Sequence, residues 1–171
     1  MVLGNGVYIM CKRMNHFDEA GNAVMVDVTD KEDTVRTAVA RGRIAVSCEV
    51  FEAVKQGTAA KGDVLGVARV AGIMAAKRTS ELIPMCHPLM LTKVSVDFSM
   101  DEERSEIEAV CIAGLTGKTG VEMEALTGVA TALLTIYDMC KAMDRGMVLK
   151  EICLAEKSGG KSGHYKVSDE S

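Results

Sequence analysis

Two stretches decide the fold: LTKVSVDFSMDEERSEIEAVCIAG at residues 91–114 and VEMEALTGVATALLTIYDMCKAM at residues 121–143. In the first, apolar residues alternate with polar ones on both sides of a charged turn at residues 101–105, namely Val94, Val96, Phe98, Ile107, Ala109 and Cys111. Two alternating runs joined by a polar turn predict a β-hairpin. The second stretch places its apolar residues at helical spacing and predicts the longest helix of the chain.

The segments around this hairpin and helix complete a regular order. Residues 48–55 form a predicted short helix that ends at Gly57, and residues 61–82 have apolar side chains close to a 3.6-residue period. A strand is predicted over 147–154, and within the mixed segment 34–47 the end at 44–46 is strand-like. The order strand, helix, helix, strand, strand, helix, strand is a split β-α-β pattern. It predicts an α+β sandwich with helices packed on one face of an antiparallel sheet, followed by a flexible tail from residue 157.

Composition narrows the class of protein. A chain of 171 residues is expected to form one domain, and its net charge of -4 argues against nonspecific nucleic-acid binding. No apolar run approaches the roughly 20 residues of a membrane span, so no membrane partner is expected. The six cysteines are scattered without a C-x-x-C pair, which predicts neither a zinc site nor a disulfide framework and favours the cytoplasm. Residues 1–15 are expected to be a disordered leader.

The two prolines of the chain, Pro84 and Pro88, bracket Met85-Cys86-His87. Proline restricts its own φ and that of the residue before it, so this tripeptide is expected in a stiff turn between a helix and a strand. A histidine held there can point into a cleft and titrate near neutral pH. The alternative is a stiff connector whose histidine lies at the surface.

Two segments resemble part of a phosphate-binding P-loop, Gly117-Lys118-Thr119 and Gly160-Lys161-Ser162. The true motif needs a glycine five residues before its second glycine, where this chain has Ile112 and Ala155. A P-loop kinase is therefore disfavoured. Backbone N–H groups and ammonium charge at residues 117–120 and 157–163 remain candidates for phosphate contacts. For the second segment, a flexible tail is the equal alternative.

Several charged residues carry candidate proton chemistry. Asp138 and Lys141 lie three residues apart near the end of the long helix among apolar neighbours, which favours a buried proton-transfer pair over a solvated surface ion pair. Lys61 opens the helix predicted over 61–82. An ammonium near a helix N-terminus is electrostatically disfavoured, which favours the neutral lysine that a general base requires. Glu122 and Glu124 lie in the first helical turn, where the dipole alone already favours acids.

The long helix also constrains the assembly. Glu124 and Asp138 are fourteen residues apart, which is roughly 21 Å along an unbroken helix at 1.5 Å per residue. One small pocket of a single chain cannot hold both. If both act on one small substrate, a second subunit must contribute to the site.

Seven segments in one order carry a family resemblance: MVDVT at 25–29, KGDVL at 61–65, AAKRT at 75–79, LIPMCHPL at 82–89, LTGKTGVEMEALT at 115–127, YDMCK at 137–141 and KSGGKSG at 157–163. Together they resemble the MoaC family of molybdenum cofactor biosynthesis. The resemblance spans residues 16–167, which we expect to form a single catalytic domain, with a flexible C-terminus at 168–171.

The resemblance implies a ferredoxin-like fold and a homohexamer, a trimer of dimers with active sites between subunits. It also implies a lyase that converts a cyclised guanosine triphosphate into cyclic pyranopterin monophosphate and diphosphate, with no metal or organic cofactor. The residues that it implies are catalytic are Asp138, Lys61, Lys141 and His87. Those that it implies bind substrate are Met85, Cys86, His87, Met123, Glu124, Glu122 and Arg36.

Expelling diphosphate requires cations around the leaving group. The candidates are Arg36, Lys77, Arg78, Lys157 and Lys161. The rival hypothesis is a non-catalytic ligand-binding module on the same scaffold, because a fold does not by itself imply a function. Turnover of the cyclised nucleotide with release of diphosphate distinguishes the two.

Overall fold

The computed structural model describes residues 20–168, so the predicted leader 1–15 and the last three residues lie outside the described range. Five strands form one antiparallel sheet in the order β2-β3-β1-β4-β5. The strands are β1 (Thr34–Ala45), β2 (Lys93–Asp101), β3 (Glu106–Gly117), β4 (Val148–Ser158) and β5 (Tyr165–Lys166). The helices are α1 (Cys48–Gln56), α2 (Val64–Ala76), α3 (Thr79–Leu82) and α4 (Glu122–Cys140).

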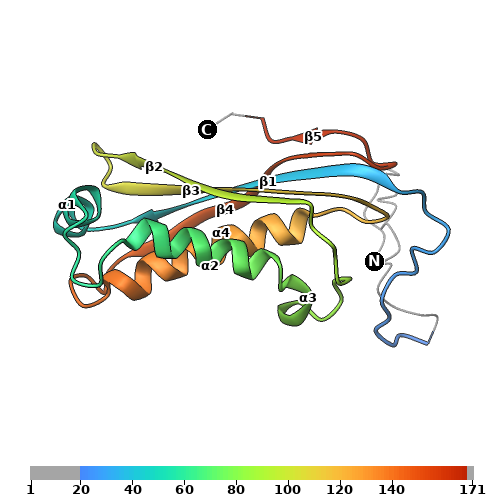
Figure 1. Cartoon of the computed structure of the whole chain (residues 1–171), viewed down its shortest axis with the longest axis horizontal. Helices are drawn as coiled ribbons and strands as arrows, with labels where there is room; N and C mark the ends of the chain where they lie inside the picture. The colour runs from blue at the N-terminus through green and yellow to red at the C-terminus, as the bar shows by residue number, and fades with distance from the viewer. Residues whose placement is uncertain (1–19, 169–171) are drawn as a thin grey trace, which may run out of the picture.

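Helices α2 and α4 lie side by side on one face of the sheet, and α1 lies at one end of it (Figure 1). The predicted α+β class, with helices on one face of an antiparallel sheet, is confirmed. Apart from α1, α3 and the two-residue strand β5, the chain order is the β-α-β-β-α-β of a split β-α-β unit. A closer ferredoxin-like relationship stays a prediction.

The core lies between the sheet and this helical layer. Strand β1 pairs with β3 along its whole length, from Thr34 opposite Gly117 to Ala45 opposite Glu106. Every second residue in the later part of β1 is buried against the helices, and β3 alternates in the same way. Three of the four buried residues of β1 are small, namely Ala38, Ala40 and Gly42, which allows α4 to lie close to the sheet, and the fourth is Ile44.

Three details of the sequence prediction were wrong. The helix predicted over 61–82 is divided, because α2 ends at Ala76 and α3 is a separate turn whose N-cap, Arg78, has a non-helical φ of -115°. Residues 34–47 were not recognised as a long strand, since polar residues interrupt the apolar pattern of β1. The tail from residue 157 contains the end of β4 and all of β5.

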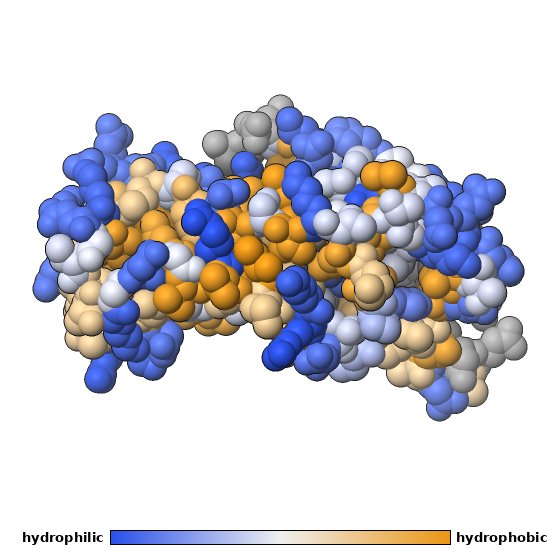
Figure 2. All heavy atoms as spheres, viewed as in Figure 1, coloured by the Kyte–Doolittle hydropathy of each residue, from blue (hydrophilic) through white to orange (hydrophobic). Residues whose placement is uncertain are grey.

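Apolar side chains reach the surface along the middle of the molecule in this view, with hydrophilic residues around them (Figure 2). The exposed apolar residues of α2 and α4 are Val67, Val70, Met74, Met123 and Leu134. In the described range, none of the helices combines the length and the apolar character needed to cross a bilayer.

Helices α2 and α4 approach each other closely at two glycines. A Cβ atom on Gly72 would lie 2.8 Å from the Gly128 carbonyl oxygen, and one on Gly128 would lie 2.6 Å from the Cys111 sulfur. The Gly72 contact is to backbone, which cannot rotate away. The close crossing of these helices therefore depends on glycine, which has no side chain, at positions 72 and 128.

We predict that Gly72→Ala destabilises the protein by roughly 1–3 kcal/mol, because a methyl group is forced into a packed contact. At an exposed helical position the same change from glycine to alanine would stabilise the protein by about 1 kcal/mol. The sign of the change in the free energy of unfolding therefore distinguishes the two situations. The measurement is the free energy of unfolding in urea. Glu49→Ala on exposed α1 is the control and should change it by less than about 0.5 kcal/mol. A Gly72→Ala variant more stable than the parent would contradict the close crossing.

Candidate active site

The predicted site residues gather at the two ends of α4, which we call the N-terminal and C-terminal half-sites. The N-terminal half-site contains Met85, Cys86, His87, Glu122, Met123 and Glu124, with Arg36 in the adjoining cavity. The C-terminal half-site contains Lys61, Asp138 and Lys141. Helix α4 runs unbroken between them. One chain therefore does not bring all of the predicted residues together, which agrees with the separation expected from the length of this helix.

In the C-terminal half-site, two lysines hold one carboxylate. Lys141 donates to one oxygen of Asp138 at 2.5 Å, and Lys61 donates to the other at 3.3 Å and to the Asp138 carbonyl at 3.0 Å. Lys61 reaches α4 because it lies in the turn before α2, where Asp63 caps that helix by accepting from the Gly66 N–H. Hydrogen bonds from Lys141 and then Lys61 lower the pKa of Asp138 below its ordinary value.

This pair was predicted to be buried, and that prediction was wrong for the single chain. The Asp138 side chain is 58% exposed, and both lysines are about as open. The apolar neighbours Ile136 and Cys140 face the core, so the intervening residue on the helix points outward. An open cavity of about 470 Å³ lies beside the pair, lined by Lys61, Tyr137, Lys141, Ala142 and Arg145.

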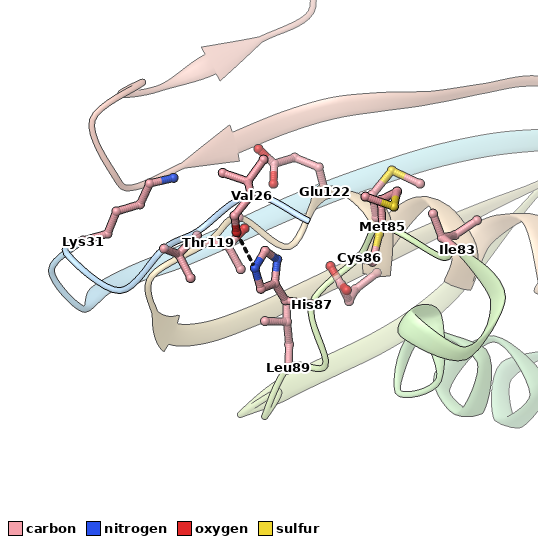
Figure 3. A pocket seen from close by; sticks show the side chains of 13 residues that line it. Val26, Lys31, Ile83, Met85, Cys86, His87, Leu89, Thr119 and Glu122 are labelled. Carbon is pink, nitrogen blue, oxygen red and sulfur yellow. Dashed lines mark hydrogen bonds between the residues drawn. The ribbon is translucent and has the colours of Figure 1, made fainter. Parts of the chain in front are cut away.

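The N-terminal half-site contains a cavity of about 410 Å³ with mainly apolar walls (Figure 3). The turn after α3 contributes Ile83, Met85 and Leu89, and the start of α4 contributes Met123. Hydrogen bonding of the Cys86 N–H to the Ile83 carbonyl at 3.0 Å closes this turn. The predicted turn around the two prolines is therefore present, and its residues line the cavity.

Glu124 is the buried acid of this cavity. Its relative exposure is 4%, and burial, reinforced by the nearby Glu122, raises its pKa above the ordinary value of 4.5. Burial and the Glu124 charge likewise raise the pKa of the Cys86 thiol. Burial of this kind shifts the titration of an acid toward its protonated form, which can donate a proton or a hydrogen bond.

His87 lies at the mouth of the same cavity. Its Nε2 is 2.9 Å from the carbonyl oxygen of Val26. A carbonyl can only accept, so Nε2 donates, and Nδ1 is the acceptor of the neutral ring. The histidine thus lines the cavity, which agrees with the interpretation that it points into a cleft.

A second cavity, of about 710 Å³, adjoins the first and is rich in cations. The two share Lys31, Thr119, Gly120 and Glu122. The cationic residues that line the second cavity are Lys31, Arg36, Lys118, Lys157 and Lys161. Of the cations predicted to neutralise phosphate, Lys77 and Arg78 line neither cavity.

The loop between β4 and β5 shapes this basic cavity. Gly159 and Gly160 have φ values of +98° and +71°, and a Cβ on Gly160 would lie 2.2 Å from the Arg36 guanidinium. Arg36 itself donates to the carbonyls of Gly117 and Lys118, at 2.9 and 3.2 Å. The glycines thus let the loop close over a fixed arginine, and the flexible-tail interpretation of residues 157–163 was wrong.

Comparison with known proteins identifies the family. A family model described as the MoaC family matches residues 25–160. This chain belongs to the MoaC family.

Relatives within this family are similar over nearly their whole length. Cyclic pyranopterin monophosphate synthase of Heliobacterium modesticaldum is 62% identical over 152 residues, which cover 89% of this chain and 96% of that protein. The proteins with the same name from Clostridium botulinum and Clostridium perfringens are 59% and 58% identical over 156 residues. Those alignments cover 91% of this chain and 98% and 99% of the relatives.

Sequence reasoning missed several residues that line the site of this MoaC chain. Val26 and Val28 line the apolar cavity and Lys118 the basic one, yet none was a predicted site residue. Lys118 lies in a segment proposed for phosphate contacts, and the two valines lie in one of the family motifs. Within the described range, no cluster of three or more His, Cys, Asp or Glu side chains is arranged to hold a metal ion.

We predict that the buried Glu124 makes stability fall as pH rises. Its pKa is raised on folding, so above pH 4.5 the folded state binds more protons than the unfolded state until the raised pKa is passed. Stability is therefore lost through this window, and Glu124→Gln should abolish the loss. The measurement is the free energy of unfolding in urea from pH 4 upward. Glu81→Gln, at an exposed carboxyl, is the control. Equal pH slopes in Glu124→Gln and the parent would contradict the assignment.

Proposed function

We propose that this protein is a cyclic pyranopterin monophosphate synthase. In that reaction 3′,8-cyclo-7,8-dihydroguanosine 5′-triphosphate becomes cyclic pyranopterin monophosphate and diphosphate, an early step of molybdenum cofactor biosynthesis. The observation that carries the proposal is the Asp138 carboxylate held between Lys61 and Lys141 in a chain of this family. The names of the close relatives support it further.

The Lys61–Asp138–Lys141 cluster suits the proton transfers of this reaction. Rebuilding a purine-derived ring system requires groups that give and take protons at several atoms. Asp138 stays ionised because both lysines donate to it, so it can accept a proton while either ammonium donates one. Substrate that enters the adjoining cavity would meet both lysines at its wall.

The N-terminal half-site suits the two chemically different parts of the substrate. The walls of the apolar cavity can contact the faces of a heterocycle, and the buried Glu124 carboxyl can form a hydrogen bond to it. Met85, Cys86, Met123, Glu122 and Glu124 are its proposed binding residues. The adjoining cations, including Arg36, are proposed to hold the phosphates and stabilise the departing diphosphate. His87 is proposed to share in proton transfer through Nδ1.

The complete active site is proposed to form between subunits of a homohexamer, in the cytoplasm. Helix α4 holds the two half-sites roughly 21 Å apart, so a second chain must bring the missing half. The exposed apolar side chains of α2 and α4 support assembly, because contiguous apolar surface commonly marks a protein interface.

We predict that Asp138→Asn and Lys141→Ala each lower turnover by about two orders of magnitude or more while the fold is kept, as expected when a proton-transfer group is lost. The measurement is diphosphate release from the cyclised nucleotide, with circular dichroism to monitor folding.

Lys55→Ala is a matched control, because Lys55 forms an ion pair of similar openness with Glu102 at 2.8 Å, and neither residue lines a cavity of the half-sites. It should change turnover by less than about twofold, since exposed ion pairs contribute little. Near-normal activity of both Asp138→Asn and Lys141→Ala would remove this cluster from the mechanism.

A further inference from the structure

An extended segment before β1 crosses the mouth of both cavities of the N-terminal half-site. We call residues 24–33 the strap. Val26 and Val28 line the apolar cavity, Asp30 and Glu32 line the basic one, and Lys31 lines both. The strap thus forms a wall common to the two cavities, although it belongs to neither the sheet nor a helix.

The strap lies on the site by one face. Val26 and Val28 are half-buried, whereas Met25, Asp27 and Thr29 are exposed, which is the alternation of an extended chain resting on a surface. Locally it is stiffened by Asp27, whose Oδ1 accepts from both the N–H and the hydroxyl of Thr29, at 2.8 and 2.6 Å. With so little buried apolar surface, the strap is expected to open and close without unfolding the sheet.

Two side chains of the site bind carbonyls of the strap. His87 Nε2 donates to Val26 at 2.9 Å, and Lys118 Nζ donates to Thr29 at 2.6 Å. The histidine is the more rigid donor, since it stands between two prolines at the end of a closed turn. Figure 3 shows the imidazole directly beneath Val26, with the bond drawn between them.

We propose that His87 is a positioning residue, whose Nε2–H bond to Val26 holds the strap closed over the substrate site. This role is additional to any proton transfer through Nδ1, and its effect on catalysis rests on the proposed function. A closed strap keeps Val26, Val28 and Lys31 at the walls of the site. Loss of the bond therefore weakens substrate binding first.

Two variants that carry an amide side chain at position 87 test whether the hydrogen bond from His87 to Val26 holds the strap closed. In His87→Gln the amide nitrogen is as many bonds from Cβ as Nε2 is in histidine, so it can still donate to Val26. His87→Asn carries the same amide one methylene shorter and cannot reach. His164→Gln is the control, because that exposed histidine contacts Glu156 and lines neither cavity of the N-terminal half-site.

The primary measurement is hydrogen exchange of the strap amides in the full chain without substrate. We expect exchange in His87→Asn to be about tenfold faster, the effect of losing one hydrogen bond on a local opening. His87→Gln and His164→Gln should stay within about twofold of the parent. Unchanged exchange in α4 and β3 shows that the fold is intact. Equal exchange rates of the strap amides in His87→Asn and in the parent would overturn the proposed role of the His87–Val26 hydrogen bond.

The second measurement separates closure from proton transfer. If closure positions substrate, KM should rise in His87→Asn in inverse proportion to the closed fraction of the strap, by up to about tenfold, and should return toward the parent value in His87→Gln. A high KM in His87→Gln with a protected strap would overturn the role in substrate binding. Absence of turnover in the parent would count against the proposed function alone, because strap exchange is measured without substrate.

Discussion

Helix α4 runs without a break from Glu122 to Cys140, and the positions of both half-sites depend on it. One side of this helix is buried along its length against β1 and β3, and α2 crosses it where Gly72 meets Gly128. A kink would separate the helix from both layers, exposing apolar surface and leaving backbone groups unpaired. The packing of the core therefore fixes the distance between Glu124 and Asp138, and any site that uses both residues has to span that distance or combine two chains.

The two ends of α4 provide different chemistry. At its N-terminus, burial raises the pKa of Glu124, and the cavity that Glu124 lines adjoins a second cavity rich in cations. At its C-terminus, Asp138 is open to solvent and remains ionised between Lys61 and Lys141. With the proposed proton transfer at one end and the proposed phosphate binding at the other, both half-sites can serve one reaction only where two chains meet. The exposure of the Lys61–Asp138–Lys141 cluster in a single chain agrees with this proposal.

Much of the fold could be predicted because alternation and helical periodicity report burial directly. The hairpin at residues 91–114 and helix α4 show these patterns clearly, and both are present. Strand β1 was obscured by Arg36, Arg41 and Arg43, which interrupt its apolar pattern. Arg36 donates to the Gly117 and Lys118 carbonyls, and Arg43 pairs with Glu108, contacts that no local pattern reveals. In β4 the alternation is disturbed by Glu151, whose φ of 55° accompanies a shift of register against β1.

The candidate site was predictable only where its residues are close in sequence. The contact between Asp138 and Lys141 follows from helical spacing. Lys61 lies 77 residues away from Asp138, and Val26 lies 61 residues from His87, so neither contact could be derived from periodicity. Family motifs pointed to these segments without showing which atoms meet. The openness of Asp138 was also beyond local reasoning, because it depends on which side of α4 faces the core.

Mixing inactive subunits tests most directly whether two chains complete one site. Glu124→Ala chains keep an intact C-terminal half-site, and Asp138→Asn chains keep an intact N-terminal one. After joint dissociation and reassembly, random exchange gives about a quarter of sites with both halves intact, and diphosphate release should recover to about that fraction of the parent rate. Asp138→Asn mixed with Lys141→Ala is the control, because both defects lie in the same half-site and no whole site can form. Mixed oligomers of the first pair that recover no activity would contradict a site shared between chains.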